Sequence, residues 1–228
     1  MIDFEFRFLP ATAYGLELIR QNYVGQVRMV DFSAHFGFRA TAGDMPWNWW
    51  SDETRGGGAL GAIGSHAADM LRLTIGSPRR VTCDLVTFVP ERSGQRVTSD
   101  DSCALIVEFE SGARATLQIS AAAGATEARL GIYGSEGQIS VPNIYGPDLL
   151  GAKRADRLAA IEIPQNFRIE PEHPTLRAPF RVLLTRMVHA IDNHLPSPSP
   201  NFDDAVASQA LLDSARLSHQ KRCWVDIL

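Results

Sequence analysis

Residues 55–76 read RGGGALGAIGSHAADMLRLTIG, and the rest of the chain is organised around this stretch. The glycines in its first half let the backbone enter positive φ and pack closely against other backbone. Ser65 is a favourable N-cap, so we expect a helix that opens at His66 and ends at Gly76. In the first turn of that helix, the dipole would favour a neutral imidazole.

His66 has two interpretations from the residues alone. A neutral imidazole at the mouth of a glycine-lined cleft can accept or donate a proton in catalysis. A histidine in a first helical turn can equally be a packing residue, so both interpretations stay open. Asp69 lies three positions later and shares the neighbouring part of the helix surface.

Residues 56–61 (GGGALG) match the spacing G-x-G-x-x-G of a dinucleotide-binding loop. That loop needs a buried strand before it and an acidic residue about 20 positions later. The preceding residues are WNWWSDETR, and Asp84 lies within a predicted strand instead of ending one. We therefore predict that this motif does not bind a dinucleotide, and the sequence has no Walker A pattern.

Composition excludes several classes of function. The chain has 228 residues, enough for one or two domains, and a formal net charge of −4, which argues against nucleic acid or an anionic membrane as partner. Its three cysteines lie far apart without metal-ligand spacing or a disulfide framework, which favours a reducing, cytoplasmic location and no metal. We expect neither a signal peptide nor a transmembrane helix, because no apolar run is suitable.

The hydrophobic pattern predicts an α+β fold. Alternating or apolar runs predict strands at residues 3–8, 27–39, 81–89, 102–109, 113–120, 128–132, 139–141, 159–163 and 223–227. Helical spacing and capping residues predict helices at residues 11–23, 66–75, 178–195 and 202–220. Short turns between consecutive strands indicate an open, mainly antiparallel meander with one solvated face, so the helices should pack on the other face.

Three tryptophans, Trp47, Trp49 and Trp50, lie in the loop at residues 40–55. Three such large side chains so close together rarely all fit a core. They can form the wall of a pocket or cap the apolar end of the sheet, and the residues do not decide between these interpretations. His35 falls on a mostly polar strand face, which favours an exposed position or a subunit contact.

The order of several segments resembles the C-terminal lobe of the Gfo/Idh/MocA family, the glucose–fructose oxidoreductase and inositol dehydrogenase type. The resembling segments are FEFRFLPA at 4–11, YVGQV at 23–27, GGGALGAIGSHAADMLR at 56–72, IYGSEGQISV at 132–141 and NFDDAVASQALLDSARLSHQKRCWVDI at 201–227. Together they span almost the whole chain, and the segment at 56–72 is the most specific of them.

The resemblance implies that residues 1–228 form one substrate-binding and oligomerisation lobe. In full-length members this lobe accompanies a Rossmann domain that binds NAD or NADP and contributes a Glu-Lys-Pro segment. The lobe of such members brings the substrate pocket and often a dimer contact through the sheet. We therefore expect a small-molecule substrate and a homo-oligomer through the sheet face.

The resemblance also assigns roles to single residues. His66 matches the catalytic or substrate-orienting histidine, and Ala62 stands where many members have an aspartate. Arg7 matches the arginine of the first lobe strand, and Asp69 matches the acid after the histidine. The predicted substrate-binding residues are Arg7, Trp47, Trp50, Arg55 and Asp69.

The chain shows neither a Rossmann pattern nor a Glu-Lys-Pro segment, so we expect no NAD(P) bound to it and no turnover by it alone. It is either a piece of a longer protein or a protein that has lost cofactor binding. The first hypothesis is the substrate lobe of an NAD(P)-dependent oxidoreductase that acts on a sugar, polyol or similar hydroxylated compound. The alternatives are a non-enzymatic ligand-sensing or assembly module, recognised by ligand-dependent oligomer size without nucleotide, and a purely structural role.

Overall fold

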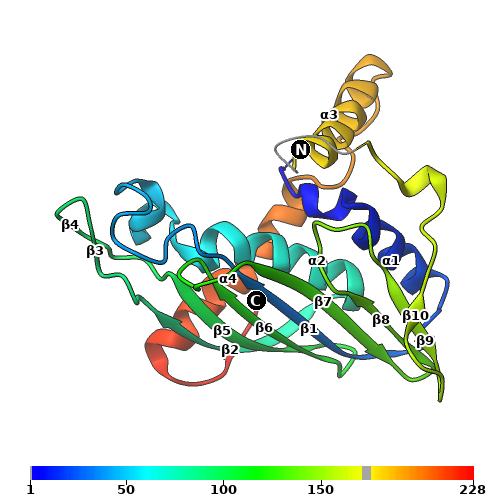
Figure 1. The fold of residues 1–228 in the computed structure, drawn as a ribbon, viewed down its shortest axis with the longest axis horizontal. Coiled ribbons are helices and arrows are strands. Elements are labelled where there is room, and N and C mark those ends of the chain that lie inside the picture. Colours follow the sequence, from blue (N-terminus) through cyan, green and yellow to red (C-terminus); the bar gives the residue numbers. More distant parts are fainter. Residues whose placement is uncertain (1, 171–175) are drawn as a thin grey trace.

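One large sheet dominates the computed structural model, which describes residues 2–170 and 176–228 (Figure 1). Its strand order within the described residues is β10-β9-β8-β7-β1-β6-β5-β2-β11. The strands are β1 (Val27–His35), β2 (Pro78–Val86), β5 (Ser102–Phe109), β6 (Arg114–Ser120), β7 (Glu127–Gly134), β8 (Gly137–Val141), β9 (Leu150–Lys153), β10 (Ala159–Ala160) and β11 (Val225–Asp226). A separate ribbon pairs β3 (Glu91–Arg92) with β4 (Gln95–Arg96).

The helices complete the fold. They are α1 (Pro10–Arg20), α2 (Ser65–Ile75), α3 (Arg177–Asp192) and α4 (Phe202–Lys221), with short helices η1 (Glu5–Phe8), η2 (Trp49–Ser51), η3 (Glu53–Arg55) and η5 (Gln165–Phe167) and a π-helical segment, η4 (Leu60–Gly64). Helices α1, α2 and α4 contact β8, β1 and β2 respectively, so they cover one face of the sheet. The α+β class with helices on one face is therefore confirmed.

Strand β1 enters the sheet in a position that the meander did not predict. It pairs in parallel with β6 and antiparallel with β7, so it separates two strands that are consecutive in the sequence. The other pairings in the sheet are antiparallel. The turn pattern correctly predicts the strand directions but says nothing about a strand inserted from elsewhere in the chain.

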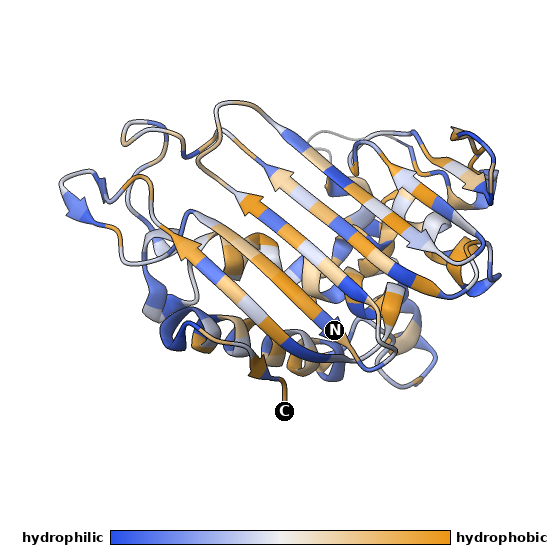
Figure 2. Cartoon of the chain, turned by 90° about the horizontal axis from the view of Figure 1, so that it is seen from below, coloured by the Kyte–Doolittle hydropathy of each residue, from blue (hydrophilic) through white to orange (hydrophobic). Residues whose placement is uncertain are grey.

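The two faces of the sheet differ because side chains alternate along each strand. On β6, Ala115, Leu117 and Ile119 are buried beneath the helices, whereas Arg114, Thr116 and Gln118 are exposed, as predicted. The opposite face is open, and Figure 2 shows hydrophilic and hydrophobic residues mixed along the strands.

The predicted strand at residues 3–8 is wrong, because residues 5–8 form the 3₁₀ helix η1. Glu5 and Arg7 are buried together with Phe6 and Phe8, so no polar face remains for solvent. The alternation of charged and aromatic residues imitates a half-buried strand, but the charged side chains have buried partners instead.

The C-terminal helices follow their local signals to different extents. Asn201 caps α4 through a capping box with Asp204, as its position predicts. α3 forms as predicted, but its apolar stripe is not a core surface. Its Val188 and Ile191 are 50% and 64% exposed, and α3 projects away from the sheet near the N-terminus (Figure 1).

Candidate active site

His66 lies within a long helical segment, not in its first turn. Helical backbone runs from Ala59 through η4 into α2. Ser65 has helical φ and ψ of −60° and −44°, and its hydroxyl donates to the carbonyl of Ala62 at 3.4 Å. The prediction that Ser65 is an N-cap is therefore wrong. The π-helical turns just before His66 are of a kind that occurs often at functional sites.

Asp100, not Ser65, accepts hydrogen bonds from the first N–H groups of this helical segment. Its carboxylate accepts a hydrogen bond from the backbone N–H of Leu60 at 2.8 Å, and its carbonyl accepts one from Ala59 at 3.1 Å. Gly58 has a φ of +96°, and a Cβ there would collide with the Asp100 side chain, so this approach requires glycine. Burial raises the pKa of Asp100 to about 6.

The same contact decides whether the glycine motif fits a dinucleotide. A helix N-terminus binds phosphate through free backbone N–H groups and the positive end of the helix dipole. Here the N–H groups of Ala59 and Leu60 are already bonded to Asp100, and its carboxylate would repel a phosphate. Residues 56–61 therefore do not fit the pyrophosphate of NAD(P).

The imidazole of His66 is held between aromatic rings of η1 and the residue before it. Phe6 stacks on it with ring centroids 4.4 Å apart, and Phe4 meets it edge-on at 5.9 Å. Burial lowers the pKa of His66 to about 4, against a smaller opposing effect of Asp3. The imidazole is neutral near pH 7, as expected, but burial is the cause and the helix dipole is not.

Glu5 is a site residue that the sequence did not indicate. Its Oε2 lies 3.5 Å from Nδ1 of His66, and its side chain is only 8% exposed. Burial raises the pKa of Glu5 to about 8, and the negative charge of Asp3 adds to the shift. The alternation in residues 3–8 places Glu5 on a solvated strand face, so no sequence signal marked it as buried.

Arg7 and Asp69 form a buried ion pair between η1 and α2. Nε of Arg7 donates to Oδ2 of Asp69 at 2.5 Å, and Nη2 pairs with the second carboxylate oxygen. Nη2 also lies 3.1 Å from Asp204, and Nη1 donates to Ser199 at 2.5 Å. The side chains of Arg7 and Asp69 are 7% and 1% exposed, so the pair joins three parts of the chain.

A continuous row of aromatic rings, here called the aromatic row, extends from His66 to the tryptophan loop. It consists of Phe6, Tyr145, Phe36, Phe38 and Trp50, whose successive ring centroids are 5.8, 6.3, 5.8 and 5.4 Å apart. These separations are typical of favourable aromatic pairs. The row is buried at Phe6 and becomes exposed at Phe38, so it links the candidate site with the surface.

The remaining predicted substrate residues take separate places. Trp50 belongs to the aromatic row and also packs against the guanidinium of Arg39 at 5.6 Å. Trp47 donates its indole N–H to the carbonyl of Arg96 at 3.0 Å, which ties it to β4. Arg55 is exposed at the end of η3. The ring contacts of the described residues thus connect Trp50, but not Trp47 or Arg55, to His66.

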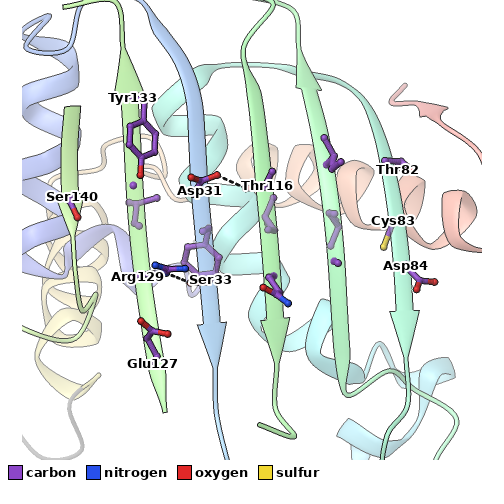
Figure 3. A pocket seen from close by; sticks show the side chains of 18 of the residues that line it. Asp31, Ser33, Thr82, Cys83, Asp84, Thr116, Glu127, Arg129, Tyr133 and Ser140 are labelled. Carbon is purple, nitrogen blue, oxygen red and sulfur yellow. Dashed lines mark hydrogen bonds between the residues drawn. The ribbon is translucent and has the colours of Figure 1, made fainter. Parts of the chain in front are cut away.

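The open sheet face carries a shallow groove of about 730 Å³ (Figure 3). Polar pairs line it: Thr116 donates to Asp31 at 2.5 Å, and Arg129 donates to Ser33 at 2.8 Å. Ile106 also lines the groove and is 43% exposed. This groove lies on the face opposite the helices and is separate from His66.

Within residues 2–170 and 176–228, no group of three or more His, Cys, Asp or Glu side chains is arranged to hold a metal ion. None of the described helices is long and apolar enough to cross a membrane.

Solved structures that share this fold include oxidoreductases. The oxidoreductase domain protein from Kribbella flavida has a TM-score of 0.86 and 25% identity, over 99% of this chain and 64% of that one. Levoglucosan dehydrogenase, in complex with NADH and levoglucosan, has a TM-score of 0.89 and 22% identity, over 100% of this chain and 65% of that one. At that identity the second likeness shows the fold alone.

Relatives found by sequence similarity also carry oxidoreductase names. An uncharacterised oxidoreductase of Synechocystis is 27% identical over 99% of this chain, and glucose–fructose oxidoreductase domain-containing protein 1 of Xenopus tropicalis is 27% identical over 97% of it. The chain spans only 64% and 62% of their respective lengths. The sequence profile of the GFO/IDH/MocA C-terminal domain matches residues 16–140, more than half of the chain. The chain therefore belongs to this oxidoreductase family.

Proposed function

We propose that this chain is the substrate-binding and assembly lobe of an NAD(P)-dependent oxidoreductase that acts on a sugar, polyol or similar hydroxylated compound. Family membership supports the reaction class, and relatives of the same fold solved with NADH support the cofactor. The observation that carries the proposal is the neutral, nearly buried imidazole of His66 at the inner end of the aromatic row.

Oxidation of a CH–OH group removes a hydride from carbon and a proton from oxygen. When NAD(P) is bound, its nicotinamide accepts the hydride. Residues 56–61 of this chain do not form the binding site for NAD(P). His66 takes the proton from the substrate oxygen, or returns it in the reverse direction. A pKa of about 4 makes an isolated imidazole a weak base. The ability of His66 to take the proton therefore depends on the side chain beside its other ring nitrogen.

The predicted substrate residues divide into three groups in this proposal. Trp50, at the outer end of the aromatic row that leads inward to His66, offers apolar surface of the kind that lines small-molecule pockets. Trp47 and Arg55 contribute from the outer loop. Arg7 and Asp69 are positioning residues, because their buried ion pair holds η1 against α2 and so fixes Phe6 over the imidazole.

Replacing His66 with alanine tests the catalytic role. In a form of the enzyme that also holds the dinucleotide, we expect kcat/KM to fall about 10²- to 10⁴-fold, since proton transfer loses its positioned base. His189→Ala, at an exposed position on α3, is the matched control and should leave kcat/KM unchanged. Equal turnover of the two variants would remove His66 from the reaction.

A non-enzymatic module of the same fold is the second candidate, favoured by the poor fit of residues 56–61 to a dinucleotide. Two titrations of the 228-residue chain, monitored by tryptophan fluorescence, distinguish the candidates. For the enzyme lobe, we expect a sugar or polyol to change the tryptophan emission, and NADH alone to produce no saturable change. A change in oligomer size on ligand addition, without nucleotide, would favour the sensing module.

We further propose that the open sheet face is the contact surface between copies of this chain. Ile106 and Met29 are 43% and 53% exposed on it, and the described helices lie on the opposite face. We expect Ile106→Arg to shift the sedimentation coefficient from a dimer to a monomer, because a cation would be buried at the contact. Ile191→Arg, which changes the same residue type at a position that is 64% exposed but lies on α3, should leave the dimer intact. A monomeric parent chain at the highest soluble concentration would refute the contact.

A further inference from the structure

Two buried polar atoms in the candidate active site, one on Glu5 and one on His66, face each other. Oε2 of Glu5 and Nδ1 of His66 are 3.5 Å apart, and neither makes a hydrogen bond within residues 2–170 and 176–228. Both atoms are shielded from solvent. Buried polar atoms without a partner are rare in native proteins. A small rotation of the Glu5 carboxyl group brings the pair into hydrogen-bond range, so each is the natural partner of the other.

Asp3, which precedes η1, is the charged group that acts on this pair. Its negative charge and a side-chain hydrogen bond add to the rise in the pKa of Glu5, and its charge partly opposes the fall in the pKa of His66. Arg7 on η1 is paired with Asp69 on α2, so its positive charge does not neutralise Glu5. Arg186 of α3 lies over an η1 phenylalanine ring at 4.7 Å. The pKa of Tyr145 is raised by burial and by Glu5, so its phenol stays neutral.

Burial acts on the two groups in opposite directions. It lowers the pKa of His66 to about 4 and raises the pKa of Glu5 to about 8. Near pH 7 the imidazole is therefore neutral and Glu5 carries a proton. Since Nδ1 of His66 faces Glu5 and is shielded, Nε2 is the nitrogen left to meet a substrate.

We propose that Glu5 is the proton-relay partner of His66: it sets the imidazole tautomer and exchanges a proton with Nδ1 while Nε2 serves the substrate oxygen. This inference rests on the proposed function of His66. Ala62, one turn earlier on the same helical segment, offers no carboxylate, so the acid reaches the imidazole from η1.

The relay balances in both directions. During oxidation, the substrate O–H bond breaks as an Nε2–H bond forms, and the Nδ1–H bond breaks as an O–H bond forms on the Glu5 carboxylate. The hydride leaves the substrate carbon for an oxidised nicotinamide, as in the proposed function. During reduction, the Nε2–H proton goes to the carbonyl oxygen and protonated Glu5 returns its proton to Nδ1. Oxidation thus starts from ionised Glu5 and reduction from protonated Glu5.

Nitrogen-15 NMR of histidine-labelled chain tests the relay without substrate or nucleotide. In the parent chain, we expect Nδ1 of His66 to change from unprotonated to protonated as pH rises through about 8, the pKa of Glu5, while the ring stays neutral. In Glu5→Gln, which keeps the side-chain shape, this tautomer change should disappear. Glu17→Gln, which removes a carboxylate of α1 that pairs with Arg20, should retain it.

A carbon-13 titration of glutamate carboxyl groups in the parent chain gives a second readout that needs no variant. One carboxyl should titrate with the same midpoint as the His66 tautomer change. A tautomer that stays constant with pH in the parent chain, or one that still switches in Glu5→Gln, would overturn the relay.

Kinetics separate this inference from the proposed function. In a dinucleotide-holding form, Glu5→Gln should lower kcat for oxidation about 100-fold and abolish its rise through the pKa of Glu5, with little change in KM. If His66→Ala abolishes turnover but Glu5→Gln keeps the parent pH profile, the relay alone fails. If the tautomer switches as expected but His66→Ala retains full turnover, the proposed function fails and the Glu5–His66 pair stands.

Discussion

Replacing Arg7 with methionine is expected to lower the free energy of unfolding by about 3–5 kcal/mol, a fall in Tm of about 6–20 °C for a chain of this size. The reason is that Asp69, 1% exposed, would keep its negative charge in the protein interior without its bidentate partner. Methionine preserves most of the buried hydrocarbon, so the loss reports the charge and not a cavity. Urea unfolding monitored by circular dichroism measures it.

The matched control is Arg20→Met, because Arg20 also pairs with a carboxylate but is 64% exposed. That change should cost no more than about 0.5 kcal/mol. Burial already raises the pKa of Asp69, and loss of Arg7 raises it further. When a carboxyl group has a higher pKa in the folded protein than in the unfolded chain, the protein loses stability as pH rises through the folded-state pKa. The stability lost in Arg7→Met should therefore become smaller as the pH is lowered. Equal losses of stability in Arg7→Met and Arg20→Met would contradict a stabilising role of the buried Arg7–Asp69 pair.

A double replacement refines the result. Arg7→Met with Asp69→Leu removes both charges and should recover much of the stability lost in Arg7→Met alone. Recovery would show that the unpaired carboxylate causes the damage. A double variant as unstable as the single one would place the loss in packing of η1 against α2.

Replacing Gly57 with alanine is expected to cost about 3 kcal/mol, because there is no room for a methyl group. A Cβ at this position would lie 2.7 Å from the carbonyl oxygen of Trp50 and 2.8 Å from that of Asp52, and would also collide with the carbonyl of Trp49. All three neighbours are backbone atoms, so they can yield only if η2 and η3 move. Thermal unfolding and tryptophan fluorescence should therefore both change.

Two other glycines separate the effect of missing space from the effect of a positive φ. Gly56 has a φ of +72° and open space around it, so Gly56→Ala should cost only about 1–2 kcal/mol for left-handed backbone. Gly124 has open space and no positive φ, so Gly124→Ala should change stability by less than about 0.5 kcal/mol. If Gly57→Ala behaved like Gly124→Ala, the tight packing of the tryptophan loop on the glycine segment would be wrong.

The sequence predicts elements whose signals are local. Asn201 followed by Asp204 predicts the start of α4 because a capping box involves only adjacent residues. The alternation along β6 predicts its buried and exposed faces for the same reason. Gly76, with a φ of 110°, ends α2 where the sequence places it.

What the sequence does not predict depends on distant partners. Glu5 and Arg7 read as solvent-facing because their partners, His66 and Asp69, lie about sixty positions away. Ser65 fails as a cap because Asp100 closes the helix from another part of the chain. The family resemblance points to His66, but neither the hydrophobic pattern nor the resemblance indicates that the carboxyl group of Glu5 lies beside it.

The position of β1 between β6 and β7 has a consequence for biosynthesis. Met29 pairs with Arg114, and Phe32 pairs with Leu130, so the centre of the sheet cannot form until β6 and β7 have been synthesised, about 80 residues or more after β1. Until then the edges of β1 present unpaired backbone N–H and C=O groups, which exposes the strand to aggregation. Pairing over such sequence separations also slows folding. Variants that weaken β6 or β7 should therefore reduce the soluble yield from cells more than their equilibrium stability alone would suggest.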